Sequence, residues 1–242
     1  MDGIIKTFLH ENEAALTKIT DFMLEYNTHT NLTRIVEPDE IIEKHYIDSI
    51  LPLILYSGEG NPAKPAKPSV TVPRGTSCLD VGSGAGFPGI PMKLFRPDLD
   101  VTLLDSAKKR TDYLSALLRH IEVECRVVTA RSEMLSHEPS YREKYELVTA
   151  RAVANLASLC EYCLPFVKVG GVFLAMKGQG APAGELADSK KACKTLGGEL
   201  SDVIEYELPS GDKRNLIVIK KIKQTPTEYP RKRINITKHP IA

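Results

Sequence analysis

The spacing of hydrophobic positions divides the chain into a helical first part and a later part in which strands and helices alternate. Between residues 3 and 26 apolar side chains recur every three or four positions, which predicts one helix with a single buried face. The run Glu37-Pro38-Asp39-Glu40 has proline and acids where a first helical turn favours them. A second helix is therefore expected from there to about Leu55.

From residue 77 onward, short apolar runs alternate with amphipathic segments. Alternating strands and helices form a mostly parallel sheet with both faces covered. The last two strands have no helix between them, so the final strand is expected to be antiparallel. The pattern predicts a doubly wound α/β fold with a seven-stranded, mostly parallel sheet and an N-terminal helical extension. The expected strands are 77–82, 100–105, 122–130, 145–152, 170–178, 198–208 and 214–222, and the expected helices are 88–97, 106–120, near 132–135, 155–167 and 183–197.

Composition divides the chain into three parts: an extension ending in a proline- and lysine-rich linker (1–70), an α/β domain (71–223) and a basic tail (224–242). The formal net charge is only +1, but it is unevenly distributed. From Lys220 to the end there are seven Lys or Arg residues and one acid, whereas the preceding body has 25 basic and 30 acidic residues. A basic tail favours a polyanionic partner, and a merely solvated tail is the alternative.

The five cysteines are odd in number and scattered through apolar segments, which is typical of reduced thiols in a cytosolic protein. Cys160 and Cys163 form one CxxC without a second pair, so no metal site is expected. The N-terminus has no basic region followed by a long apolar core, and the longest apolar run (50–56) is too short to cross a bilayer. We therefore expect a cytoplasmic protein with no membrane segment.

A glycine-rich segment, CLDVGSGAGFPGIP (78–91), begins within the first predicted strand. Ligands of such sheets lie beyond the carboxyl ends of the strands, where this segment falls. It fits two templates. Gly82, Gly84 and Gly86 fit the G-x-G-x-G loop of methyltransferases that use S-adenosyl-L-methionine, and Gly84, Gly86 and Gly89 fit the G-x-G-x-x-G dinucleotide fingerprint.

Four further residues are candidates for binding a nucleoside cofactor. Phe87 adds an apolar ring to the loop, which suits the methionine part of S-adenosylmethionine better than a diphosphate; plain core packing is the alternative. Asp105 ends the second strand, where a carboxylate can accept hydrogen bonds from both ribose hydroxyls. Ser132 and Glu133 follow the third strand and are expected beside the adenine, with helix capping as the alternative or additional role.

Arg151 lies at the end of the fourth strand, which faces the methyl acceptor in methyltransferases. The Asn/Asp-Pro-Pro-aromatic run used for exocyclic amines is missing there, and so is the Pro-Cys needed for cytosine C5. Guanine N7 has a free lone pair and no proton to lose, so alignment and exclusion of water suffice. Arg151 is then expected to position a ligand, by donating to guanine O6 or to a carboxylate; an ion pair that supports the loop is the alternative.

Seven motifs taken together resemble the bacterial 16S rRNA guanine-N7 methyltransferases, the RsmG or GidB family, over nearly the whole chain. The resemblance implies a class I, Rossmann-like enzyme that uses S-adenosyl-L-methionine to methylate N7 of one guanine in the decoding-region loop of small-subunit rRNA. By matching position, it implies cofactor contacts from Gly82, Phe87, Ser132, Glu133 and Arg151. The motifs are NLTRI (31–35), KHYIDSI (44–50), LDVGSGAGFPGIP (79–91), LLDSAKKR (103–110), ARAVA (150–154), MKG (176–178) and RNLIVIKKI (214–222).

Candidates for contact with the RNA are less sharply defined. His45 and Asp48 share a face of the second helix, either as an active-site lid or as a buried pair that fixes the helix on the sheet. The basic residues between 220 and 233 are expected to hold RNA phosphates without reading sequence. The RNA-contact candidates are Asn31, His45, Lys177, Arg214, Arg231, Lys232 and Arg233.

Two other functions stay open on the residues alone. One is a nicotinamide-dependent oxidoreductase that uses the second glycine template, and the other is a non-catalytic ribosome-assembly factor that keeps the cofactor fold. On the function that the resemblance implies, we expect the protein to be a monomer and its partner to be 16S rRNA or the small ribosomal subunit.

Overall fold

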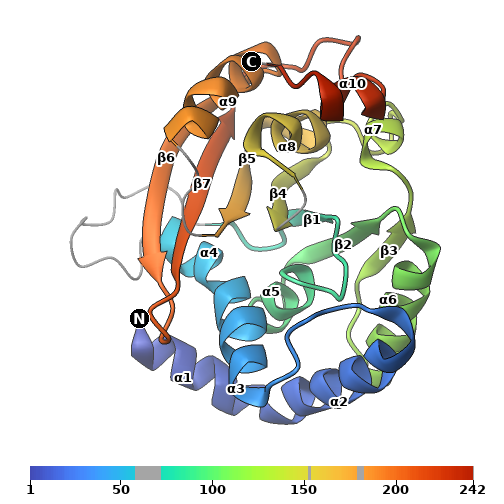
Figure 1. Cartoon of the computed structure of the whole chain (residues 1–242), viewed down its shortest axis with the longest axis vertical. Helices are drawn as coiled ribbons and strands as arrows, with labels where there is room; N and C mark the ends of the chain where they lie inside the picture. Colours follow the sequence, from blue (N-terminus) through green and yellow to red (C-terminus); the bar gives the residue numbers. More distant parts are fainter. Residues whose placement is uncertain (58–71, 152–153, 179–182, 242) are drawn as a thin grey trace.

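A seven-stranded sheet forms the centre of the molecule (Figure 1). The computed structural model describes residues 1–57, 72–151, 154–178 and 183–241, so residues 58–69 of the expected linker lie outside the described residues. The strand order is β3-β2-β1-β4-β5-β7-β6, and β7 alone runs opposite to the other six strands, which confirms the predicted sheet. The strands are β1 (Ser77–Val81), β2 (Asp100–Asp105), β3 (Arg126–Thr129), β4 (Tyr145–Arg151), β5 (Val167–Lys177), β6 (Gly198–Glu207) and β7 (Lys213–Lys221).

Helices cover both faces of this sheet because its central strands are apolar on both sides. Residues 78–81 of β1 and 101–105 of β2 are all buried. Figure 1 shows α8, α9 and α10 gathered on one face, and α2, α5 and α6 on the other. The helices of the α/β part and of the tail are α5 (Gly89–Phe95), α6 (Lys108–Ile121), α7 (Ser132–Leu135), α8 (Leu156–Cys163), η2 (Leu164–Phe166), α9 (Ala183–Thr195) and α10 (Arg233–Lys238).

The first predicted helix is two helices, α1 (Asp2–Glu11) and α2 (Glu13–Thr30). The break falls at Asn12, whose side-chain amide donates to the carbonyl oxygen of Phe8 at 2.9 Å. Asparagine side chains compete in this way with the helical backbone pattern, which a prediction based on apolar spacing does not register. Phe8 and Met23 are buried in the same hydrophobic cluster as the core of the sheet, so the extension packs directly on the α/β part.

The second predicted helix begins at Pro38 as expected but is not uniform. It consists of α3 (Pro38–Ile41), a π-helical turn η1 (Ile42–Ile47) and α4 (Asp48–Ser57). Within η1 the amide of Asp48 bonds to the carbonyl of Glu43, five residues back. Such π turns insert one extra residue into a helix and often occur at functional sites. This one places His45 and Tyr46 in the interior.

Three smaller predictions are corrected by the backbone. The third strand begins at Arg126 rather than at 122, because Glu122 ends α6 in a left-handed conformation (φ 57°). The fifth strand begins at Val167, before the glycines that were taken as its start. Ser132 is the first residue of α7 and Arg131 is the N-cap, so the capping role considered for Ser132 is wrong.

The basic tail is folded onto the body rather than merely solvated. The guanidinium of Arg142 donates to the carbonyls of Thr225, Pro226 and Tyr229, at 2.8 to 3.0 Å. Ile236 of α10 is fully buried. Over the described ranges, no helix combines the length and apolar character needed to cross a membrane.

Candidate functional site

Glycine is required in the loop between β1 and α5 by the shape of its backbone. Gly82, Gly84 and Gly86 have φ values of +76°, +57° and +99°, a region that side chains disfavour. A Cβ atom at Gly86 would also lie 2.5 Å from Cδ1 of Ile90. The amide of Gly82 donates to the carbonyl of Leu104 at 2.7 Å, which ties the loop to the end of β2. The loop therefore lies at the carboxyl edge of the sheet, as predicted.

Asp80, which was not singled out from the sequence beyond its place in the LDVG run, supports this loop from below. Its carboxylate is fully buried and accepts hydrogen bonds from the amide of Gly89 (3.2 Å) and the hydroxyl of Thr149 (3.4 Å). Burial raises the pKa of Asp80 to about 6, although these hydrogen bonds oppose the rise. A Cβ atom at Gly89 would lie 2.4 Å from Leu103 and 3.0 Å from Oδ2 of Asp80, so only glycine fits there.

Asp105 ends β2, where the sequence placed it, and is 3% exposed. Oδ2 accepts hydrogen bonds from the amide of Gly84 at 3.0 Å and from Arg110 at 3.4 Å, and Oδ1 accepts one from the amide of Ala107 at 2.8 Å. The carboxylate thus fixes the glycine loop and the start of α6 to each other. Its role as a ribose ligand stays a prediction. The two carboxylate oxygens have further lone pairs with which to accept hydrogen bonds from ribose hydroxyls.

A cavity of about 230 Å³ opens beside this loop, and we call it the glycine-loop pocket. Four of the predicted cofactor residues line it, from the ends of β1 and β2 and the start of α7. Its wall also includes three residues from α8 and α10, which lie next to α7 in Figure 1 and were not predicted for this site. The predicted residues are Gly82, Asp105, Ser132 and Glu133, and those from α8 and α10 are Tyr162, Arg233 and Thr237.

Charges of both signs meet at the wall of the glycine-loop pocket. Glu133 is 7% exposed, and Oε1 lies 3.9 Å from the guanidinium of Arg131. Burial raises the pKa of the Tyr162 hydroxyl; the charge of Glu133 adds to the rise, whereas Arg233 lowers the pKa by its charge and by hydrogen bonding. The acid at the start of α7 and the arginine of α10 therefore act on the same tyrosine.

Phe87 is buried, at 5% exposed, and packs against the N-terminal extension. The ring of His45 lies parallel to it, with 4.3 Å between centroids and 5° between planes. Tyr46 meets it edge-on at 5.9 Å, and Cζ of Arg151 lies 5.5 Å from its centroid. Phe87 thus joins the glycine loop to η1, so it has the core-packing role that was the alternative. Its contact with a cofactor stays a prediction.

Arg151 connects the end of β4 to the second helix of the extension. One terminal nitrogen, Nη1, donates to the carbonyl of Lys44 at 2.7 Å and to Oδ2 of Asp48 at 3.2 Å. The other, Nη2, lies 3.4 Å from Nδ1 of His45. The structure therefore places His45 and Asp48 on either side of Arg151, which bridges them.

The environment of His45 determines which ring nitrogen carries the proton. A guanidinium can only donate, so Nδ1 accepts from Arg151. Nε2 then carries the hydrogen and donates to the hydroxyl of Thr33 at 3.0 Å. Burial, together with the charge of Arg151, lowers the pKa of His45 to about 3. The imidazole is thus neutral, with both nitrogens occupied.

Asp48 is 4% exposed and joins four elements of the fold. Its Oδ1 accepts a hydrogen bond from the hydroxyl of Tyr206 on β6 at 2.8 Å, and Nε of Arg214 on β7 lies 3.9 Å from Oδ2. Burial and the negative charge of Asp48 raise the pKa of Tyr206. Tyr206 was not recognised from the sequence because nothing in its neighbourhood marks it as more than a strand residue.

A second cavity, of about 460 Å³, lies beside these residues, and we call it the arginine pocket. Lys177 on its wall forms an ion pair with Glu185 at 2.8 Å and donates to the carbonyl of Ala154 at 3.0 Å. Three of the RNA-contact candidates, His45, Lys177 and Arg214, are brought together here. The pocket is lined by Ile35, Lys44, His45, Asp48, Arg151, Met176, Lys177, Gly178, Tyr206 and Arg214.

The remaining RNA-contact candidates lie elsewhere. Asn31 ends α2 in a left-handed conformation (φ 51°) and lines neither pocket. Arg231 is held by Glu161, with Nη2 to Oε2 at 2.7 Å and Nε to Oε1 at 2.9 Å. Lys232 is exposed at the start of α10, and Arg233 lines the glycine-loop pocket. Contact of these residues with RNA stays a prediction.

The two pockets flank the end of β4. Arg151 lines the arginine pocket, and Ala154, three residues later, lines the glycine-loop pocket. Residues 152 and 153, part of the ARAVA motif, lie outside the described residues. Residues on either side of this short segment therefore line different pockets. Among the described residues, no group of three or more potential metal-binding side chains occurs.

Comparisons with known proteins agree with this arrangement. A family model described as GidB, rRNA small subunit methyltransferase G, matches residues 12–217. The chain is 47% identical over 225 residues to Ribosomal RNA small subunit methyltransferase G of Acetivibrio thermocellus, covering 91% of this chain and 85% of that protein. Its counterpart from Desulforamulus reducens is 41% identical over 238 residues, covering 97% and 92%. A SAM dependent methyltransferase structure from Aquifex aeolicus shares the fold, with a TM-score of 0.50 at 13% identity over 76% of this chain and 93% of that one.

Proposed function

The chain belongs to the GidB family of rRNA small subunit methyltransferases G, and on that premise we propose that it methylates N7 of a single guanine in 16S rRNA. Family membership makes the chain a methyltransferase that uses S-adenosyl-L-methionine. The oxidoreductase alternative is therefore wrong. The single observation that carries the rest of the proposal is the pair of pockets on either side of the end of β4.

The glycine-loop pocket is the proposed site for the adenosyl part of the cofactor. Asp105 would accept from the ribose hydroxyls, and Ser132 and Glu133 would face the adenine edge. The methionine part would extend past Gly84 and Phe87 toward Arg151. What supports this placement is that Asp105, Ser132 and Glu133 line one cavity at the carboxyl ends of parallel strands, where nucleotide ligands bind in this class of fold.

The arginine pocket is the proposed site for the guanosine acceptor. Arg214 and Lys177 present cations there, and Ile35 and Met176 add apolar surface for a base. An arginine can donate to guanine O6. N7 must stay free of hydrogen bonds, because its lone pair is the nucleophile. These side chains come from the extension, β5 and β7, so the extension completes the acceptor pocket.

The reaction needs no proton acceptor. S-adenosylmethionine, when bound, would supply an electrophilic methyl group, and the N7 lone pair would be the nucleophile. The chain's part is to align the two molecules and to exclude water. His45 suits that part, because its two nitrogens are occupied by Arg151 and Thr33 and its ring is fixed against Phe87. We assign it a positioning role rather than that of a general base.

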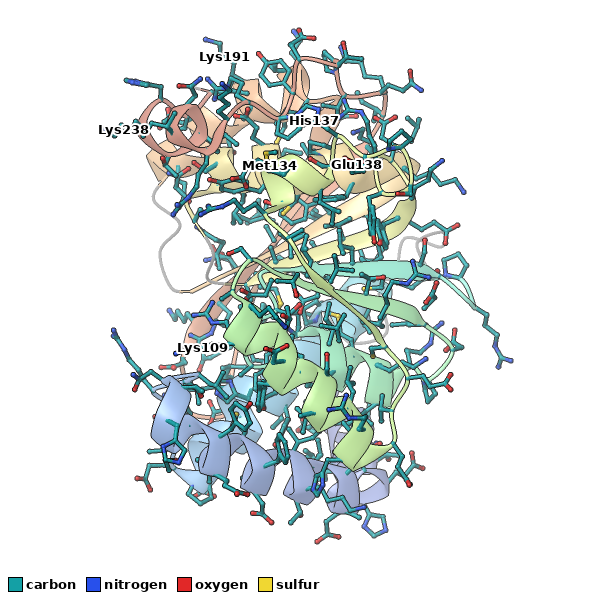
Figure 2. All side chains as sticks on the ribbon, turned by 90° about the vertical axis from the view of Figure 1, so that its right-hand side faces the viewer. Lys109, Met134, His137, Glu138, Lys191 and Lys238 are labelled. Atoms are coloured by element: carbon teal, nitrogen blue, oxygen red, sulfur yellow. The ribbon has the colours of Figure 1, made fainter. Side chains whose placement is uncertain are left out.

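RNA would approach the carboxyl edge of the sheet over exposed basic side chains. Lys108 and Lys109 begin α6, Lys232 precedes α10 and Lys238 is its last residue. Figure 2 shows Lys109 and Lys238 on the same side of the molecule. Contacts of this kind hold phosphates and set the register of the RNA without reading its sequence. One chain supplies both pockets, so the proposal takes the monomer as the active unit.

The test is transfer of labelled methyl from S-adenosylmethionine to 16S rRNA that lacks the modification, offered as free RNA and as small subunits. Wild type is expected to transfer the label. Asp105→Ala should bind the cofactor more weakly by about 1.5–3 kcal/mol, the range for hydrogen bonds to a charged group. Asp112→Ala removes an exposed carboxylate from α6 and should bind the cofactor as wild type does. Absence of transfer to either substrate would contradict the proposal.

A further inference from the structure

Helix α10 supplies two side chains to the wall of the glycine-loop pocket. Arg233 and Thr237 line it together with Asp105 and Glu133, although more than a hundred residues separate them from the end of β2. They are four residues apart, so they share one face of α10. Figure 2 shows the next residue, Lys238, pointing outward at the surface.

Buried contacts hold α10 in this place without any ligand. Arg231, two residues before Arg233, forms a two-point ion pair with Glu161, which is fully buried. The hydroxyl of Ser158 donates to the carbonyl of Ile236 at 3.0 Å. Glu161 and Ser158 both belong to α8, which also supplies Tyr162 to the pocket. The wall is therefore built in advance by α8 and α10 together.

We propose that α10 is a wall of the cofactor pocket, in which Arg233 and Thr237 contact the adenosyl part of bound S-adenosylmethionine. The C-terminal helix is then a positioning element for the cofactor as well as part of a basic surface. The inference rests on the proposed location of the cofactor in the glycine-loop pocket. It reassigns Arg233, which the sequence alone placed among residues that hold RNA phosphates.

The chemistry of the two side chains suits an adenosyl group. A guanidinium is planar and weakly hydrated, so it stacks on an aromatic face such as that of adenine. The hydroxyl of Thr237 donates its hydrogen back to the carbonyl of Arg233 at 3.0 Å. With its hydrogen used in this way, the oxygen keeps lone pairs that can accept, as an exocyclic amine requires. Tyr162, which interacts with Arg233, adds an aromatic ring to the same wall.

The experiment measures binding of S-adenosylmethionine by calorimetry with no RNA present, so that effects on RNA contact do not enter. We expect Arg233→Ala to weaken binding about tenfold, the loss of one well-placed cation–π contact. Arg233→Lys should restore part of the affinity, because it keeps the charge but not the planar surface. Thr237→Val should weaken binding about threefold, in line with the loss of one neutral hydrogen bond. Lys238→Ala is the matched control and should bind as wild type, because Lys238 does not line the pocket.

A second readout uses the unmutated protein. Hydrogen exchange at the amides of α10 should slow when S-adenosylmethionine is added, because a ligand that contacts the helix opposes its local opening. Amides of α1, which lies at the other end of the molecule from α10, should not change (Figure 1).

The outcomes separate this inference from the proposal beneath it. The role of α10 would be overturned if Arg233→Ala and Thr237→Val bound S-adenosylmethionine as wild type does and hydrogen exchange in α10 did not slow. If Asp105→Ala bound it more weakly in the same experiment, the location of the cofactor pocket would still stand. Asp105→Ala also binding as wild type would overturn the location of the pocket itself. An equal loss in Arg233→Ala and Lys238→Ala would show a long-range charge effect and contradict direct contact.

Discussion

The imidazole of His45 lies flat on the phenyl ring of Phe87, with 4.3 Å between the ring centroids. His45 belongs to the π turn of the N-terminal extension, and Phe87 belongs to the glycine loop of the α/β part. Arg151 bonds to the same imidazole from the end of β4. The three residues connect the extension, the glycine loop and the strand that separates the two pockets, so the extension is part of the site.

The state of His45 predicts how stability depends on pH. Its pKa is about 3 in the folded protein against an ordinary value of 6.5, so the unfolded chain takes up a proton that the folded chain excludes. The contribution of His45 is therefore full above pH 6.5 and is lost as the pH falls below it. Relative to His45→Gln, wild type should lose about 2 kcal/mol of unfolding free energy between pH 7 and pH 4.5.

Urea denaturation of both proteins at half-unit steps of pH measures this difference directly. The variant is the baseline for wild type, because the two proteins share all other titrating groups. Parallel curves over the whole range would show that His45 is protonated as easily in the folded protein as in the unfolded one. The ring could not then accept a hydrogen bond from Arg151 as described.

Arg151 should matter for the cofactor more than for the RNA. If it reaches the methionine carboxylate, Arg151→Ala should raise the dissociation constant of S-adenosylmethionine at least tenfold, as expected for a lost charge-assisted hydrogen bond. Arg126→Ala removes an exposed arginine at the far end of β3 and is the matched control. Unchanged cofactor affinity with a lower kcat would instead move Arg151 to the acceptor.

Arg231 is expected to stabilise the fold rather than bind RNA. Arg231→Ala would leave the carboxylate of Glu161 buried and unpaired, which should cost about 3 kcal/mol in unfolding free energy. The neighbouring Lys232→Ala should change it by no more than about 0.5 kcal/mol. Adding Glu161→Gln to Arg231→Ala should recover much of the loss, because no buried charge remains. Equal stability of the two single variants would contradict the assignment.

The exposed lysines around α10 should account for part of the salt dependence of RNA binding. Each phosphate contact contributes about 0.7 to 0.9 to the slope of log affinity against log salt, so Lys232→Ala with Lys238→Ala should lower the slope by about 1.5. The matched double variant, Lys144→Ala with Lys168→Ala, lies at the opposite edge of the sheet and should keep the wild-type slope. Filter binding from 50 to 300 mM salt gives both values. Identical slopes for the two double variants would remove α10 from the RNA surface.

Local patterns in the sequence were sufficient for much of the fold. Strand β2 falls on the residues that its apolar run predicts, and the glycine loop lies where the first strand ends. Asp105 at the end of β2 and Ser132 and Glu133 just after β3 line one cavity, as expected for residues at the carboxyl ends of neighbouring parallel strands, and their contact with a cofactor stays a prediction. These signals span only a few residues.

What the sequence did not show depends on contacts between distant segments. Asp48 meets Tyr206 across 158 positions, and Glu161 meets Arg231 across 70. The charge of Arg231 alone suggested a free phosphate contact, whereas the buried partner that occupies it is visible only in three dimensions. The break at Asn12 was missed for a different reason: a single side-chain hydrogen bond decides it, and apolar spacing carries no trace of such a bond.

The central claim is tested most directly by identifying the methylated base. Small-subunit rRNA without the modification would be incubated with the protein and labelled S-adenosylmethionine, then digested to nucleosides and to mapped fragments for mass spectrometry. The account predicts 7-methylguanosine at one position. The account would be contradicted by a methyl group on another atom or base, or by methylation of many guanines. It would also be contradicted if neither free rRNA nor intact subunits were methylated.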